Sequence, residues 1–323
     1  MYERLDFAAN HYLAAFYFSA NMKKLSIIII TYNRAIDLLE LLGDITHLTN
    51  KDLLEDVIVV NNESTDDYSA VYTFIEQNKS VNFNLIEAPE NLGVSRGRNY
   101  ATQFAKGDIF VYFDDDITIK DTGVLSKIVE CFNDKFDRKI GAVSFKVFYS
   151  SNGQIQINAF PHKKFEEYKN KTEFLTYYYT GCAHAITKEA WDITGDYPIN
   201  FFYGMEEYDF SYRLLNNGYC IKYDASVVIY HKESPLGRKP KPIKLRMMWV
   251  NKTKIAWWYL PKKYYYSTAA MWAVEFLVKT SFNIPNFLLA IKEIIRIPRT
   301  EKRAPISENT LEYLKKVEAR LWY

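Results

Sequence analysis

The sequence has few cysteines, and their spacing does not suit a metal site built from thiolates. Its three cysteines, Cys131, Cys182 and Cys220, are widely separated and odd in number, and no Cys-x-x-Cys pair occurs. A zinc–thiolate centre is therefore not expected. The same scarcity is typical of a protein that works in a reducing compartment, so a cytoplasmic location is predicted.

Long apolar runs are also missing. No stretch reaches 18 uninterrupted apolar residues, so no membrane-spanning helix is expected. The apolar run 12–18 is short and follows acidic residues without a basic region, which is not typical of a signal peptide.

The net charge of +2 gives no reason to expect nucleic acid as a partner. With 48% hydrophobic and 25% charged residues, the chain can form a packed globular core.

Two common nucleotide-binding motifs are absent. The sequence contains neither a Gly-x-Gly-x-x-Gly string nor a Gly-x-x-x-x-Gly-Lys-Ser/Thr string. A Rossmann dinucleotide site and a P-loop are therefore poorly supported.

Buried strands alternating with helices dominate the first third of the chain. A continuous β-branched run at 25–33 and further expected strands at 56–64, 83–89 and 108–116 alternate with amphipathic or polar segments. This order predicts an α/β fold with a mostly parallel central sheet flanked by helices. Ligands in such sheets bind beyond the carboxyl ends of the strands. Three of these four ends are polar, so they should converge on one site.

The pattern changes after residue 140. Strands are expected at 141–149, 174–187 and 220–231, with a polar loop or flap over 150–172 and a helix over 206–218. From residue 240 onward the composition predicts basic, aromatic-rich helices.

Two of the polar clusters follow strands. Asp114, Asp115 and Asp116 follow the fourth strand, where carboxylates can hold Mg²⁺ or Mn²⁺ together with a phosphate; a solvated turn is the alternative. Asn62 and Asp66 follow the second strand and can bind a base or ribose, or cap the next helix.

Three further positions carry chemistry. Arg98, between Gly93 and Tyr100, offers a guanidinium to a phosphate or base. Glu206 and Glu207 begin a helix and can supply a general base, or merely favour the helix start. His231 ends an apolar strand and is either a metal ligand or a structural histidine.

Asp209 and Arg213 stand four residues apart on the same expected helix. This spacing predicts an ion pair, either on the surface or behind the site.

Taken together, seven segments resemble glycosyltransferase family 2, whose members have the GT-A fold. They cover about residues 24–235 and read "IIIITYNR", "VIVVNNESTDD", "NLGVSRGRNYA", "GDIFVYFDDD", "TGCAHAITKEAW", "GMEEYDFSYRLLNNGY" and "VVIYHKESP". The resemblance implies inverting, metal-dependent transfer of a hexose from a nucleoside-diphosphate sugar. The implied acceptor is a hydroxyl of a saccharide or lipid-linked saccharide, as in bacterial surface polysaccharide synthesis. A nucleotidyltransferase and a non-catalytic relative that binds nucleotide-sugars are the alternatives.

The resemblance also implies roles for individual residues. The nucleotide-sugar is expected to contact a group of six residues: Thr31, Tyr32, Asn62, Arg98, Asp114 and Asp115. Asp116 is expected to hold Mn²⁺ or Mg²⁺, with His231 joining it. Glu207 takes the position of the general base. Because the family usually has Asp where this chain has Asn61 and Glu207, base selectivity is open and Glu206 remains a possible base.

The expected domain organisation has three parts. Residues 1–23 form an N-terminal extension, and residues 24–235 form the catalytic domain. Within that domain the nucleotide half covers about 24–120 and the acceptor half about 121–235. Residues 236–323 form a basic, aromatic helical region. Within it, 238–297 suits either peripheral contact with an anionic membrane or packing against the catalytic domain or a second subunit.

Overall fold

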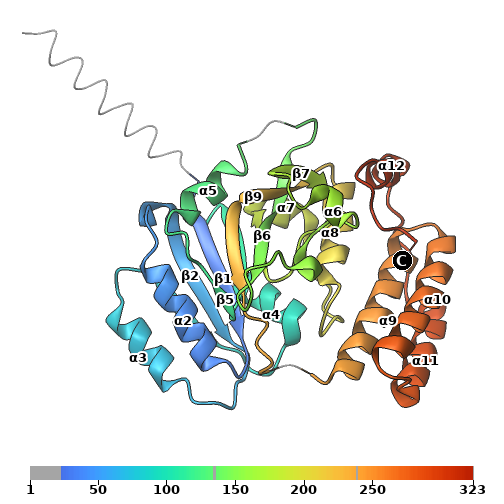
Figure 1. Cartoon of the computed structure of the whole chain (residues 1–323), viewed down its shortest axis with the longest axis horizontal. Helices are drawn as coiled ribbons and strands as arrows, with labels where there is room; N and C mark the ends of the chain where they lie inside the picture. The colour runs from blue at the N-terminus through green and yellow to red at the C-terminus, as the bar shows by residue number, and fades with distance from the viewer. Residues whose placement is uncertain (1–22, 134–135, 238, 323) are drawn as a thin grey trace, which may run out of the picture.

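The computed structural model describes residues 23–133, 136–237 and 239–322. Almost all of the expected N-terminal extension, including its apolar run, lies outside these residues. A central sheet runs through the molecule, with helices α2 (Ala35–Thr46) and α3 (Ser69–Gln77) at one end. A group of C-terminal helices stands at the opposite end (Figure 1).

The first half of the sheet is parallel. Strands β1 (Leu25–Thr31), β2 (Leu54–Asn61), β3 (Phe83–Glu87) and β4 (Ile109–Asp114) lie in the order β3-β2-β1-β4. Both faces of β1 are covered: one face packs into one hydrophobic cluster and the opposite face into another. This is why its β-branched run forms a central strand. The register aligns the ends of β1, β2 and β4, so their polar continuations meet.

The second half of the sheet is mixed, and its strand β8, which pairs antiparallel with β4, joins it to the first half. This half comprises β5 (Ile117–Thr118), β6 (Ile140–Tyr149), β7 (Glu173–Thr176), β8 (Ala183–Thr187) and β9 (Cys220–His231). Strand β9 pairs parallel with β6 and antiparallel with β5 and β7. Because Ile117 is paired with His231, the end of β9 lies beside the aspartate turn.

Several short elements differ from the expectation. The strand expected over 174–187 is two strands, because residues 177–182 leave the sheet between β7 and β8. The expected loop 150–172 contains a 3₁₀ turn, η2 (Ile157–Ala159), and the short helix α6 (Phe165–Tyr168). The elements η1 (Lys51–Leu53), α4 (Gly93–Thr102), α5 (Val124–Glu130), α7 (Lys188–Thr194) and α8 (Glu206–Asn216) complete this region.

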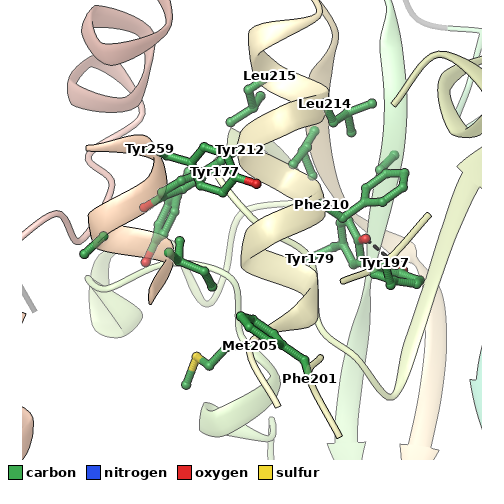
Figure 2. Close-up of a cluster of buried hydrophobic side chains, with 14 of the residues drawn as sticks. Tyr177, Tyr179, Tyr197, Phe201, Met205, Phe210, Tyr212, Leu214, Leu215 and Tyr259 are labelled. Carbon is green, nitrogen blue, oxygen red and sulfur yellow. Dashed lines mark hydrogen bonds between the residues drawn. The ribbon is translucent and has the colours of Figure 1, made fainter. Parts of the chain in front are cut away.

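Helix α8 is packed on both sides, which fixes the start of the helix in space. Figure 2 shows Tyr212, Tyr177 and Tyr259 on one side of it and Phe210 with Tyr197 on the other. The expected ion pair between Asp209 and Arg213 forms, but it does not lie on the surface, since Asp209 is only 2% exposed. The carboxylate of Asp209 also accepts a hydrogen bond from Tyr259 at 2.6 Å, which joins α8 to the C-terminal helices.

The C-terminal region is a group of packed helices. It comprises α9 (Lys241–Tyr259), α10 (Lys262–Lys279), α11 (Ile284–Thr300) and α12 (Glu308–Lys316). Trp249 of α9 is fully buried against Phe276 of α10 and Phe287 of α11. Among the described residues, no helix combines the length and apolar character needed to cross a bilayer.

Candidate active site

The aspartate turn at the end of β4 carries two buried carboxylates. Asp115 is 2% exposed and Asp116 is fully buried, whereas Asp114 is partly exposed. Burial raises the pKa of Asp115 to about 7, although the nearby Arg34 opposes this. The turn is therefore not the solvated loop considered as the alternative, and its charge must be compensated inside the protein.

Arg34 supplies that compensation on one side. Its Nη1 lies 2.7 Å from Asp115 Oδ1 and 3.3 Å from Asp116 Oδ2. Its other nitrogens donate to the carbonyl oxygens of Ser234 and Leu236. The guanidinium thus connects the end of β1, the aspartate turn and the segment after β9. The sequence interpretation missed Arg34; the available signal was a lone cation directly after the first strand.

His231 compensates Asp116 on the other side. Its Nε2 lies 3.1 Å from Asp116 Oδ1, and its Nδ1 lies 2.9 Å from Gln156 Oε1. Burial opposes the charge of His231, but its interactions with Asp116 and Cys182 raise its pKa to about 11. Although Asp116 is buried, the hydrogen bond from His231 lowers its pKa to about 2. The backbone N–H of Ser234 also donates to this carboxylate.

These groups form a set that can hold a cation. Asp114, Asp116 and His231 each offer a ligand atom, and these atoms lie within 4.8 Å of one another. Two carboxylates and one imidazole suit Mn²⁺ or Mg²⁺ better than a soft metal. When Nε2 binds a metal, Gln156 can fix the orientation of the His231 ring by accepting from Nδ1–H.

A second buried guanidinium, that of Arg98, contacts Asp114. Arg98 is 5% exposed, and its Nη2 lies 3.4 Å from Asp114 Oδ1 and 2.8 Å from the carbonyl oxygen of Gly181. Its Nη1 lies 3.2 Å from Glu206 Oε1 and 3.4 Å from Glu207 Oε1. One side chain therefore joins the aspartate turn to the glutamate pair.

The two glutamates have different environments. Glu206 is 2% exposed, and burial together with the neighbouring Glu207 raises its pKa to about 8. Its Oε2 has no hydrogen-bond partner among the described residues. The Glu207 side chain is 15% exposed and lies over Gly181, where a Cβ would come within 2.1 Å of Glu207 Oε1. A side chain at position 181 would therefore displace the Glu207 carboxylate.

The residues expected to bind the nucleotide-sugar line a cavity of about 500 Å³. Its lining includes all six of them: Thr31, Tyr32, Asn62, Arg98, Asp114 and Asp115. Asp116 and His231 lie behind this lining, and Glu206 and Glu207 lie beyond Arg98. The structure thus brings every expected site residue into one region.

Asn62 and Asp66 do not cap the following helix α3. The Asn62 side chain accepts from the Leu92 N–H at 2.8 Å and donates to the Gly93 carbonyl oxygen at 3.3 Å. It therefore shapes the turn before α4, next to the cavity. Asp66 accepts from the Ala35 N–H at the start of α2 instead.

The cavity is covered by residues that the sequence interpretation missed. Phe202 and Tyr203, from the loop before α8, line it together with Gly237, Lys239 and Pro240. Gly237 has a φ of +66°, and a Cβ there would meet the Tyr32 carbonyl oxygen at 2.3 Å. These segments show no strand or helix periodicity, so no pattern in the sequence indicated that they line the cavity.

The chain was compared with protein families and with known proteins by sequence. A family model described as "Glycosyl transferase family 2" matches residues 26–194, just over half of the chain. An "Uncharacterized protein" of Haemophilus influenzae is 29% identical over 182 residues, which are 55% of this chain and 95% of that protein.

Two solved structures share the fold. A mannosyltransferase of Pyrobaculum calidifontis, in complex with GDP-Man and Mn²⁺, is 19% identical with a TM-score of 0.54, covering 93% of this chain and 85% of that chain. TarS residues 1–349 of S. aureus, in complex with UDP-GlcNAc, is 16% identical with a TM-score of 0.58, covering 89% and 82%. At these identities the likeness establishes the GT-A fold.

The first prediction concerns Arg34. Replacing Arg34 with Met removes its ion pairs with Asp115 and Asp116 and its hydrogen bonds to two carbonyl oxygens, so we expect the free energy of unfolding to fall by about 3–5 kcal/mol. Urea denaturation measures this. Arg96→Met, at a half-exposed side chain paired with Glu90, is the control. Adding Asp115→Asn to Arg34→Met should restore part of the loss. Equal losses in Arg34→Met and Arg96→Met would contradict the prediction.

The second prediction concerns pH. Because the folded pKa of Glu206 is raised, the folded protein keeps a proton that the unfolded chain loses above about pH 4.5. Stability from this group is therefore present at low pH and lost as the pH rises towards 8, by up to about 1.4 kcal/mol per pH unit.

The Glu206→Gln variant should lose less stability than the wild type between about pH 5 and 8, measured by urea denaturation across that range. Glu312→Gln, at an exposed position of α12, should follow the wild type. Parallel stability curves for Glu206→Gln and the wild type would show that Glu206 is not the source of the pH dependence.

Proposed function

The chain belongs to glycosyl transferase family 2, and from that premise we propose that it moves a sugar from a nucleoside-diphosphate sugar to a hydroxyl acceptor with inversion. The observation that carries the proposal is the continuous row formed by the cavity, the Asp114–Asp116–His231 cluster, Arg98 and the glutamate pair. We further propose a hexose as the sugar and a saccharide or lipid-linked saccharide of a bacterial surface glycan as the acceptor.

The donor occupies the 500 Å³ cavity, a volume within the usual range for small-molecule sites. The GDP-Man and UDP-GlcNAc complexes of the two related structures support this class of donor, although their bases differ. We assign base recognition to the region of Asn62, which acts by fixing the turn at Leu92 and Gly93. Thr31 and Tyr32 border the nucleotide.

A divalent cation, Mn²⁺ or Mg²⁺, would be held by Asp114, Asp116 and His231. The fit rests on the oxygen and imidazole ligand atoms within 4.8 Å of one another. When bound, the cation would supply the positive charge that stabilises the leaving nucleoside diphosphate. Arg34 keeps Asp116 in place from the opposite side, and Asp115 anchors Arg34.

Glu207 is the proposed general base. Glu206 keeps its proton at neutral pH, because its pKa is raised to about 8, and it is the more buried of the two. Glu207 is then the carboxylate that can accept the proton of the acceptor hydroxyl as the oxygen attacks the anomeric carbon. The bond to the diphosphate breaks on the opposite face, so the configuration inverts in a single step. Arg98 orients Glu207 through its Nη1.

We assign the donor site and the acceptor site to the two halves of the expected catalytic domain. Residues 24–120 provide most of the donor site, and residues 121–235 provide the glutamate pair and the acceptor side. Phe202, Tyr203 and the segment 237–240 add a cover to the donor cavity from outside the first half.

The function is tested with a panel of nucleoside-diphosphate sugars, with Mn²⁺ and with chelator. We expect one nucleotide to raise the thermal stability of the protein, and chelator to remove most of that shift. Slow release of the nucleoside diphosphate without acceptor identifies the sugar. A folded protein that responds to no nucleotide would favour the non-catalytic alternative.

Variants separate the proposed roles. Asp116→Asn should abolish metal-dependent nucleotide stabilisation, because it removes one ligand charge. Glu207→Gln should keep that stabilisation and lower turnover by about 10²–10⁴-fold, the usual contribution of a general base. Glu206→Gln should retain far more turnover than Glu207→Gln. If turnover survives in Glu207→Gln and is lost in Glu206→Gln, Glu206 is the base.

A further inference from the structure

The turn between α10 and α11 presents an apolar surface to solvent. Val274, Val278, Phe282 and Leu288 each expose 60% or more of their surface, and Ile284 exposes 48%. They come from the last turns of α10, the connecting residues and the first turns of α11. We name this surface the hairpin tip: Val274, Val278, Phe282, Ile284, Leu288 and Leu289. Large apolar side chains gathered in this way mark an interaction surface.

Basic residues flank the hairpin tip at Lys279, which pairs with Glu275, and continue along α11 to its last turn. Lys279, Lys292, Arg296 and Arg299 are all exposed on the same two helices. Glu293 is the one exposed acidic residue between positions 270 and 300, a range that the structure describes in full. An apolar surface with a basic margin is complementary to the apolar interior and anionic headgroups of a lipid bilayer.

The basic, aromatic segment that first suggested a membrane surface turns most of its aromatic side chains inward, although Tyr266 is 65% exposed. Within 238–266, Trp249 is fully buried, and Trp257, Tyr259, Tyr264 and Tyr265 are at most 8% exposed. These aromatics form the interior of the helical region, as the packing alternative for this segment required. Composition alone could not distinguish an inward from an outward face, whereas the exposure of α10 and α11 does.

The hairpin tip lies towards the end of the molecule that holds the donor cavity. Helix α9 starts directly after Pro240, which lines that cavity. Helix α10 runs back antiparallel, since Trp257 contacts Tyr265 while Trp249 contacts Phe276. The turn after α10 therefore returns to the level where α9 begins. The three helices stand together at the edge of the molecule, away from α2 and α3 (Figure 1).

We propose that the hairpin tip docks on the surface of an anionic lipid bilayer. The apolar side chains insert at the level of the headgroups, while the four basic residues contact anionic lipids. This position is interfacial, which agrees with the finding that no described helix can span a bilayer. An isologous pairing with a second copy is disfavoured, because it would bring two basic margins together. Resting on the proposed function, docking here would place the donor cavity near an acceptor carried by a lipid.

The test uses the full chain without nucleotide or acceptor, so it is independent of catalysis. Binding is measured by co-sedimentation with phosphatidylcholine vesicles, with and without phosphatidylglycerol. We expect binding to the anionic vesicles that weakens with salt. Phe282→Ser combined with Leu288→Ser should weaken it by about tenfold or more, through the lost apolar insertion. Lys292→Glu combined with Arg296→Glu should weaken it by at least as much.

Matched variants control for composition. Ile36→Ser combined with Ile193→Ser removes two exposed apolar side chains on α2 and α7, and Lys79→Glu combined with Lys163→Glu reverses two exposed charges elsewhere. Both control variants should bind like the wild type. Unchanged thermal stability shows that each variant is folded.

Three outcomes would overturn the proposal. The first is a wild type that sediments with neither vesicle, the second is hairpin variants that bind as tightly as the controls, and the third is a hairpin tip that forms a dimer contact. Light scattering of wild type and Phe282→Ser/Leu288→Ser detects the last case as a dimer that the variant loses. None of these results would bear on sugar transfer, which the nucleotide panel tests separately.

Discussion

The site depends on burying negative charge without leaving it unpaired. Asp115 and Asp116 lie inside the protein at the end of β4, where an isolated carboxylate would be strongly destabilising. Arg34, which follows β1, pairs with Asp115, and His231, at the end of β9, pairs with Asp116. Arg34 also donates to the carbonyl oxygens of Ser234 and Leu236. The side chain that pairs with the aspartates of the proposed metal site therefore also positions the segment that leads to the cavity lining.

Arg98 likewise compensates buried negative charge, next to the glutamate pair. It faces three carboxylates at once, and their number exceeds its single charge. The excess is relieved by the proton on Glu206, whose pKa burial has raised. Burial and the neighbouring Glu207 thus raise the pKa of Glu206 against the opposing effect of Arg98, which also contacts Asp114.

The sequence was sufficient for the elements whose pattern is set by local physics. The continuous β-branched runs predicted β1, β2 and β4, because strands buried on both faces need apolar side chains at successive positions. The aspartate turn and the glutamate pair were also recognised. Arg34 was not, because its role comes from two segments about 80 and 200 residues away along the chain. The burial of Asp209 depends likewise on Tyr259, which no local pattern reveals.

The contact between Asp116 and His231 spans 115 positions of the chain. Contacts this far apart in the chain slow folding, and His231 ends β9, the strand that also pairs with β5, β6 and β7. During synthesis the aspartates therefore leave the ribosome well before their partner. A nascent chain lacking β9 would carry the acidic turn without one of its two compensating cations, so the molecule acquires its cation site only once its topology is complete.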